Sequence, residues 1–229
     1  MRENCAIVVA AGKGTRMGKG INKQFLKIKD KPILVYTLEV FNNHPKIDRI
    51  ILVAAKEEVQ YCKSNIVEKY NINKVKSIVS GGKNRQESVF NGLKEIRDAN
   101  IVLIHDGARP FVKNNIISKG IEYAEMYGAC SCGVKPKDTV KVKDIKGFLI
   151  KSIDRNTLIN IQTPQCFKYE LILKCHEDVV DKENDFTDDT SIVEFFGHKV
   201  YIYDGDYSNI KITTPEDMVF AEAILEKLY

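Results

Sequence analysis

Cysteine is scarce in this chain, with six residues among 229. Six cysteines are too few for a disulfide scaffold, and none of them forms the paired C-x-x-C spacing of a structural zinc site. Cys130 and Cys132 bracket a single residue, which leaves a redox or metal pair open but favours buried structural thiols. This cysteine usage predicts a reduced protein of the cytoplasm.

Long apolar runs are also missing. The first apolar run, residues 5–11, is followed at once by the letters GKGTR. It therefore has neither the small-residue cleavage site of a signal peptide nor the length of a membrane helix. We expect a soluble, cytoplasmic protein that has no membrane partner.

Neither sign of charge dominates, because 35 lysines and arginines stand against 31 aspartates and glutamates, a formal net charge of +4. This near-balance disfavours a dedicated binder of duplex DNA, which concentrates many more cations on one face, so we expect no nucleic-acid partner. The apolar content of 44% is enough to fill a core and excludes disorder. The sequence has no internal repeat and no Pro/Ser-rich linker, so residues 1–229 are expected to form a single domain.

Short apolar segments alternate with stretches of helical periodicity. Four segments predict strands, three of them almost continuously apolar, as strands buried on both faces should be: residues 5–11, 50–55, 75–79 and 101–104. Helices are predicted over residues 32–41, 86–96 and 114–127. This order predicts an α/β fold with a mostly parallel, Rossmann-like doubly wound sheet. Such sheets bind ligands beyond the carboxyl ends of their strands, so the loops after Ala11, Val79 and Ile104 are candidates for a site.

Residues 137–155 interrupt this pattern. Apolar and polar residues alternate around Val140, Val142 and Ile145, and a turn at Lys146-Gly147 precedes a second β-like stretch. The pattern predicts a β-hairpin within the domain. One interpretation is a solvated edge hairpin whose lysines block aggregation. Because a lone hairpin is marginal in water, we favour an arm that clasps a second subunit.

A glycine-rich loop, AAGKGTRMG over residues 10–18, follows the first predicted strand. It lacks the G-x-x-x-x-G-K-[ST] pattern, and its glycines are spaced one residue too far apart for a dinucleotide fingerprint. No full helix separates it from the next strand, so an NAD-dependent enzyme that uses Asp30 as its ribose acid is disfavoured. The loop amides can approach phosphates, with Arg16 and Lys23 close by, although a simple turn with surface cations is the alternative.

Two further loops follow strands. In GGKNRQES, residues 81–88, two glycines at a helix N-terminus let the backbone pass close to a ligand, and Arg85 adds charge; the alternative is a tight turn with a solvated arginine. In HDGARP, residues 105–110, Asp106 suits magnesium held together with phosphate oxygens. The HDGARP sequence is equally compatible with a structural ion pair between Asp106 and Arg109. His105 is a less favoured candidate, because phosphoryl transfer to a nucleophile that is already ionised needs no base.

The C-terminal half contains QTPQ (residues 162–165), TDD (187–189) and SNIKITTPED (208–217). The last of these has a local explanation, because Thr214 can cap a helix that Pro215 begins, with Glu216 and Asp217 at its positive end. Lys211, expected on a short strand before this helix, is not explained by capping.

These motifs, in this order, closely resemble those of the 2-C-methyl-D-erythritol 4-phosphate cytidylyltransferases: AAGKGTRMG, KQFL, GGKNRQESVFNGL, HDGARPFV, QTPQ, TDD and NIKITTPED. The resemblance runs from Ala6 to the C-terminal helix. It implies a nucleotidyltransferase of the glycosyltransferase-A-like fold that transfers cytidylyl from CTP to methylerythritol phosphate in the non-mevalonate isoprenoid pathway. It also implies magnesium (Mg²⁺) as cofactor, pyrophosphate as product and a homodimer joined by the 137–155 arm.

The resemblance assigns roles position by position. It implies four catalytic residues: Arg16, Lys23, Arg155 and Lys211. It implies contacts to the nucleotide from Ala10, Ala11, Gly12, Gly14, Gly81, Gly82, Arg85 and Ser88. It implies contacts to the polyol phosphate from Asp106, Ala108, Arg109, Thr139, Thr163 and Thr187, with Asp106 also beside the metal and Thr139 and Arg155 reaching in from the partner's arm. Ser208 departs from the family pattern, where many members have an acidic residue, so a second metal carboxylate is not expected.

Two alternatives remain. A ribitol 5-phosphate cytidylyltransferase shares the CTP half of such a site, but Ala11-Gly12-Lys13 and Gly107-Ala108-Arg109 favour methylerythritol phosphate as the acceptor. A non-catalytic nucleotide-binding protein on the same fold would be expected to have lost its phosphate-facing cations. Arg16, Lys23 and Lys211 are all present in this sequence.

Overall fold

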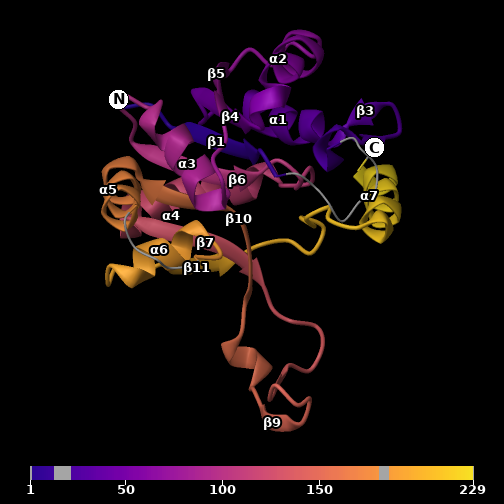
Figure 1. The fold of residues 1–229 in the computed structure, drawn as a ribbon, viewed down its shortest axis with the longest axis vertical. Helices are drawn as coiled ribbons and strands as arrows, with labels where there is room; N and C mark the ends of the chain where they lie inside the picture. Colours follow the sequence, from indigo (N-terminus) through magenta and orange to yellow (C-terminus); the bar gives the residue numbers. More distant parts are fainter. Residues whose placement is uncertain (1, 13–21, 181–185, 229) are drawn as a thin grey trace.

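A seven-stranded, mostly parallel sheet forms the centre of the protein in a computed structural model that describes residues 2–12, 22–180 and 186–228 (Figure 1). The strand order is β11-β7-β10-β6-β1-β4-β5. β10 is antiparallel to both of its neighbours, whereas the other pairings are parallel. In chain order the strands are β1 (Cys5–Ala10), β4 (Arg49–Ala54), β5 (Val75–Ser80), β6 (Ile101–Asp106), β7 (Ala129–Val134), β10 (Asn160–Lys168) and β11 (Tyr201–Asp204).

Alternate residues of β1 pack into two separate apolar layers, one on each face of the sheet. Ala6 and Val8 belong to the layer covered by α1 (Ile33–Asn43) and α4 (Asn114–Tyr127). Ile7 belongs to the layer covered by α3 (Arg85–Lys94), α5 (Tyr169–Val179) and α6 (Asp189–Phe195). Because both faces of the central strands are covered, the nearly continuous apolar runs of the sequence are explained.

Short elements and the C-terminal helix complete the body. They are η2 (Lys23–Phe25), β2 (Lys27–Ile28), β3 (Lys31–Pro32), η3 (Lys56–Glu58), α2 (Val59–Tyr61), η4 (Cys62–Glu68) and α7 (Pro215–Leu228). At the start of α7, the Asp217 carboxylate accepts a hydrogen bond from the Thr214 amide over 2.9 Å, one half of a capping box. Within the described ranges, no helix combines the length and apolar character that crossing a bilayer requires.

The predicted fold class is confirmed, with differences in detail. All four predicted strands and all three predicted helices are present, and the helix over residues 114–127 has the predicted bounds. The first helix starts at Ile33 because Pro32 pairs with Lys27 in the small β2–β3 sheet. The short strand predicted at Lys211 is wrong, since residues 209–214 are irregular. The apolar pattern of the sequence does not predict the remaining strands of this sheet, β7, β10 and β11.

The segment between β7 and β10 projects from the body as a hairpin, at the lower end of Figure 1. Its antiparallel strands are β8 (Lys141–Lys143) and β9 (Leu149–Ser152), followed by the single turn η5 (Arg155–Thr157). Phe148 and Ile150 expose 71% and 62% of their surfaces. An apolar surface of this kind on a lone hairpin is unfavourable when it is exposed to water.

Candidate active site

Two adjoining cavities open at the carboxyl ends of the central strands. The first has a volume of about 330 Å³ and the second of about 150 Å³. Arg85, Asp106 and Lys211 line both of them. The first is also lined by Ala10, Ala11, Gly12, Lys23, Gln24, Gly82, Asn84, Ser88 and Ala108, and the second by Arg109, Gln162, Thr163, Thr187 and Asp188. Most of the residues predicted for the nucleotide therefore gather in the first cavity. Of those predicted for the acceptor, Asp106, Arg109, Thr163 and Thr187 line the second cavity, whereas Ala108 lines the first.

The loop that follows β5 approaches the loop that follows β1 so closely that position 81 requires glycine. A Cβ on Gly81 would lie 2.3 Å from the Cβ of Ala11 and 2.9 Å from Ser88 Oγ. The Gly81 amide donates to the carbonyl of Ala54, at the end of β4, over 2.8 Å. Gly12, by contrast, has no atom of the described residues within 4 Å of where a Cβ would stand, so among these residues nothing blocks a ligand from its backbone.

Ser88 holds the second glycine loop in shape. Its hydroxyl donates to the carbonyl of Asn84 over 2.8 Å and accepts from the Gly82 amide over 3.0 Å. Asn84 caps α3 by accepting from the amide of Glu87 over 2.8 Å. Since Asn84 and Arg85 line the first cavity, the positive end of α3 lies at this cavity and favours an anionic ligand there.

Lys23 reaches the first cavity from η2, and a buried neighbour fixes this turn. The side-chain amide of Gln24 donates to the carbonyl oxygen of Ala10, the last residue of β1. The same nitrogen lies 3.5 Å from Glu58 Oε2, which also accepts a hydrogen bond from Asn22 over 3.1 Å. Gln24 was not predicted as a site residue. Its place inside the KQFL motif was the only signal in the sequence that could have indicated it.

Asp106, the last residue of β6, has three cationic neighbours. Its carboxylate oxygens lie 3.0 Å from Lys211 Nζ, 3.3 Å from Arg109 Nε and 3.8 Å from Arg85 Nε. Burial alone would raise the pKa of Asp106, but Lys211, Arg85 and Arg109 together hold this pKa well below its usual range. The carboxylate is therefore ionised at every pH near neutrality, and its ion pair with Arg109 is one part of a larger cluster.

Hydrogen bonds between distant segments assemble this cluster. The Ile212 amide donates to the carbonyl of Ala108 over 2.9 Å, and Arg109 Nη1 donates to the carbonyl of Asn209 over 2.8 Å. The side-chain amide of Asn209, fully buried, donates to the carbonyl of Thr163 over 2.9 Å. Residues 209–212 are thus tied to both β6 and β10, which places Lys211 beside Asp106 without the predicted strand. Asn209 was not predicted as a site residue.

His105 is fully buried behind the site. Its Nε2 lies 3.1 Å from the carbonyl oxygen of Arg109, and its Nδ1 lies 3.0 Å from Thr163 Oγ1, which also accepts from the Asp106 amide. A carbonyl only accepts, so Nε2 carries the proton and Nδ1 accepts from the threonine hydroxyl. Burial is the main cause that lowers the pKa of His105 to about 4. The imidazole is therefore neutral at pH 7 and supports Asp106, Arg109 and Thr163 from behind.

This lowered pKa predicts a pH dependence of stability. Below pH 6.5 the unfolded chain binds a proton at His105 that the folded chain does not bind. The free energy of unfolding should therefore fall by about 3 kcal/mol through this residue between pH 6.5 and pH 4. Urea denaturation across this range should show a smaller fall for His105→Gln than for the wild type. The exposed His198→Gln serves as control, and equal pH profiles for His105→Gln and the wild type would contradict the prediction.

Thr163 and Thr187 lie at the second cavity on different elements. Thr163 is buried on β10, whereas Thr187 is exposed just before α6. Gln165 Nε2 donates to Asp188 Oδ2 over 2.8 Å, and Asp188 caps α6 by accepting from the Ser191 amide over 2.9 Å. These bonds fix the TDD segment against β10 and so hold the two threonines at one cavity.

Among the predicted residues that the structure describes, Gly81, Thr139 and Arg155 do not line these cavities. Arg16 and Gly14 lie outside the described residues. Thr139 and Arg155 are exposed on the projecting hairpin, where Arg155 Nη1 donates to the carbonyl of Lys137 over 3.4 Å, and neither residue lines the two cavities. Their predicted action from a partner subunit stays a prediction.

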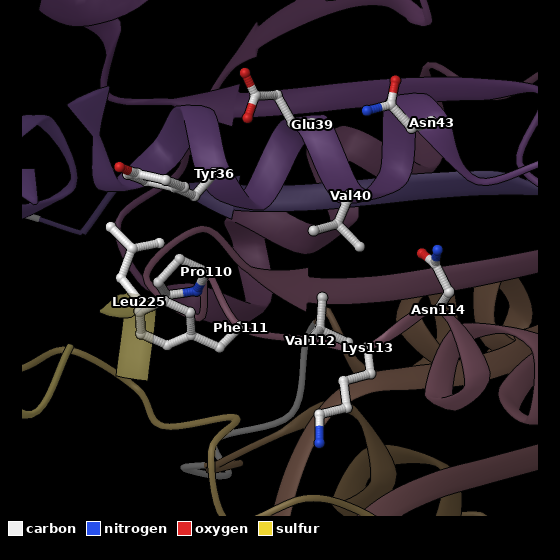
Figure 2. Close-up of a pocket in the computed structure, with 10 residues that line it drawn as sticks. All are labelled: Tyr36, Glu39, Val40, Asn43, Pro110, Phe111, Val112, Lys113, Asn114 and Leu225. Carbon is white, nitrogen blue, oxygen red and sulfur yellow. The ribbon is translucent and has the colours of Figure 1, made fainter. Parts of the chain in front are cut away.

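A separate groove of about 390 Å³ lies between α1, the segment after β6 and α7 (Figure 2). Val40 and Val112 approach each other from opposite walls in this view. The charged side chains that line it have partners elsewhere: Glu39 pairs with Lys31 over 2.8 Å, and Lys113 pairs with Asp206. None of the predicted site residues that the structure describes lines this groove, so its size alone does not make it a candidate active site.

Comparisons with known proteins agree with this arrangement. Residues 4–227 match the family described as 2-C-methyl-D-erythritol 4-phosphate cytidylyltransferase. A protein of that name from Clostridium novyi is 56% identical over 228 residues, covering 100% of this chain and 99% of the relative. Another from Clostridium acetobutylicum is 58% identical over 224 residues, covering 98% of each chain.

A solved structure gives the same result in three dimensions. The crystal structure of 4-diphosphocytidyl-2C-methyl-D-erythritol synthase from Anaerococcus prevotii superimposes with a TM-score of 0.88 and 36% sequence identity. The superposition covers 98% of this chain and 96% of that chain. A match over nearly the whole sequence, together with the two adjoining cavities, shows that this chain belongs to the 2-C-methyl-D-erythritol 4-phosphate cytidylyltransferase family.

Proposed function

We propose that this chain transfers the cytidylyl group of CTP to 2-C-methyl-D-erythritol 4-phosphate. The products are 4-diphosphocytidyl-2-C-methyl-D-erythritol and pyrophosphate, a step of the non-mevalonate isoprenoid pathway. The observation that carries the proposal is the pair of adjoining cavities that meet at Arg85, Asp106 and Lys211. A phosphate of one ligand and a phosphate of another would approach each other at this junction. Relatives that are named for this activity and match over the full length support it.

The proposed reaction is an in-line attack by a phosphate oxygen of the acceptor on the α-phosphorus of CTP. A phosphate monoester is largely ionised near pH 7, because its second pKa is about 6, so the nucleophile needs no base. The absence of a required base is consistent with His105, which is buried and neutral and so does not act as one. Catalysis then depends on alignment and on cations at the developing charge. Lys23 in the first cavity and Lys211 at the junction are placed to stabilise this developing charge. The catalytic role that the family resemblance implies for Arg16 is part of the same proposal.

The described residues fit a magnesium ion that is held mainly by substrate phosphates. No three His, Cys, Asp or Glu side chains gather as a protein-only metal site within the described ranges. Magnesium commonly uses one or two carboxylates together with phosphates and water, and Asp106 supplies one ionised carboxylate at the junction. When bound there, the ion would neutralise phosphate charge. Asp206, two residues before Ser208, is engaged instead by Lys113 and by the Ser208 amide and hydroxyl.

A homodimer joined by the hairpin belongs to the same proposal. The hairpin projects from the body and exposes apolar side chains at its end: Ile145, Phe148, Leu149 and Ile150. A second subunit that covered them would bring Thr139 and Arg155 toward a cavity of the partner. The cytoplasm is the proposed location, and it agrees with six cysteines that are all unpaired.

Pyrophosphate release tests the activity directly. The protein is incubated with CTP and magnesium, and with either methylerythritol phosphate or ribitol 5-phosphate as acceptor. We expect release with the first acceptor and at least about tenfold less with the second, because a buried polar site discriminates strongly against a mismatched hydroxyl pattern. Preferred release with ribitol 5-phosphate would change the acceptor. No release with either acceptor, from protein shown to be folded, would favour a nucleotide-binding protein instead.

A further inference from the structure

Asp189 is a buried carboxylate that has no role in the proposed reaction described above. Its side chain is fully buried, and it lines neither of the two cavities. Asp189 Oδ2 lies 2.7 Å from Nη1 of Arg85, a residue that lines both. Asp189 therefore has no direct access to a ligand, but it contacts a cation that does.

Two further contacts hold Asp189 in place, one at its side chain and one at its backbone amide. His176, also fully buried, lies with Nε2 3.2 Å from Asp189 Oδ1, and an ionised carboxylate only accepts, so this nitrogen is the donor. The Asp189 amide donates to Gln165 Oε1 over 3.0 Å. Burial would raise the pKa of Asp189, but Arg85 and His176 lower it below its usual value. The carboxylate is thus ionised and held in one place.

Arg85 lies between two carboxylates that belong to different parts of the fold. Its Nη1 contacts Asp189 at the start of α6, and its Nε lies 3.8 Å from Asp106 at the end of β6. Burial would lower the pKa of Arg85, but Asp189 and Asp106 raise it, so the guanidinium stays charged. The closer contact is with Asp189. Without it, the longer contact of 3.8 Å with Asp106 would hold the guanidinium less firmly between the cavities.

We propose that Asp189 is a positioning residue, which acts through Arg85 by holding its guanidinium at the junction of the two cavities. The inference rests on the proposed function, because it assumes that this junction is where the two substrates meet. Burial of an ion pair is often neutral or unfavourable for stability, and stability alone therefore gives little reason for it. A fixed guanidinium provides a reason, since it presents donors to phosphate without a loss of side-chain entropy at each turnover.

The competing explanation is purely structural. Asp189 is the first residue of α6, where a carboxylate interacts favourably with the positive end of the helix. Such a role would not depend on Arg85. The two explanations therefore differ in one measurable respect, which is the coupling between positions 85 and 189.

A double-mutant cycle measures this coupling. The four proteins are the wild type, Asp189→Asn, Arg85→Gln and the double variant, each in its full-length form. We expect Asp189→Asn to lower kcat/KM for cytidylyl transfer by about tenfold or more in the wild-type background, the effect of one lost bond to a charged group. With Arg85→Gln already present, the same change should lower it by about threefold or less. Equal effects in the two backgrounds would overturn the proposal.

Two further measurements make the result decisive. The dissociation constant of CTP, measured for the same four proteins without turnover, should show the same coupling, so the inference is tested even if the wild type proves inactive with methylerythritol phosphate.

If Asp189→Asn alone does not fold, the comparison of Arg85→Gln with the double variant still applies, and a double variant whose kcat/KM is about tenfold lower would overturn the proposal. Asp178→Asn, which removes an exposed carboxylate paired with Lys174 on α5, is the matched control and should match the wild type.

Discussion

Lys23→Ala should lower the single-turnover rate of pyrophosphate formation by about 10²- to 10³-fold, the usual effect of losing one preorganised donor to developing charge. The dissociation constant of CTP should change much less. The reason is the position of Lys23 in the first cavity, on the turn that Gln24 anchors to the end of β1. A cation in this place stabilises charge that grows in the transition state more than charge already present in bound CTP.

The measurement is rapid quench with enzyme in excess over CTP, combined with titration of CTP binding. Lys27→Ala is the matched control, because Lys27 is exposed on β2 and does not line the cavity. It should match the wild type in both experiments. A rate for Lys23→Ala within about threefold of the wild-type rate would remove Lys23 from catalysis. A large rise in the dissociation constant with an unchanged rate would limit it to substrate binding.

Mixing two inactive variants should restore activity if the hairpin acts in the partner subunit. Lys23→Ala damages a site in the body, and Arg155→Ala damages the arm. In a heterodimer of the two, one site has both changes and the other has neither. Random reassociation makes about half of the dimers heterodimers, so the mixture should regain about one quarter of the wild-type activity. The difference between the activity of the mixture and that of each variant alone should be large, because each variant alone should be nearly inactive.

Differently tagged subunits, purified over both tags, establish that heterodimers have formed. The expected specific activity of that purified fraction is about half that of the wild type. Activity that remains at the level of the parent variants would show that Arg155 serves its own subunit or no site at all. Lys143→Ala removes an exposed cation elsewhere on the hairpin and so controls for general changes to the arm. Mixed with Lys23→Ala, it should give the same activity as a mixture of Lys23→Ala with the wild type.

The strands that could be predicted from sequence are those with nearly continuous apolar runs. β1 (CAIVVA) and β6 (IVLIHD) are buried along their lengths, and their composition alone indicates this. β10 (NIQTPQCFK) is also largely buried, but its polar residues are satisfied by partners far away in the sequence. Gln162 bonds to the carbonyl of Asp206, and Gln165 to Asp188. Such partners are invisible to a pattern of apolar residues, so this strand was missed.

The motifs predict a set of site residues, but they do not predict the contacts among them. The structure brings Asp106, Arg85 and Lys211 together at the two cavities. Arg85, Arg109 and Lys211 all lie near Asp106, and Arg85 also pairs with Asp189. Three cations and two carboxylates leave one positive charge in this cluster. The positive charge available to the substrates is therefore smaller than the number of cationic residues in the motifs, because ion pairs between distant segments cannot be counted from one sequence.

The backbone ties that carry Lys211 to Asp106 also bear on how the protein matures during synthesis. β1, β4, β5 and β6 are adjacent in the sheet and are all complete once residue 106 has been made. Domains fold as the ribosome releases them, at about 5 to 20 residues per second. A nascent chain with these four strands paired would hold the Asp106 carboxylate before Lys211 exists, since that lysine comes almost half a chain later. The newly made enzyme should therefore gain its full charge balance only when residues 209–212 emerge, long after the core of its sheet can form.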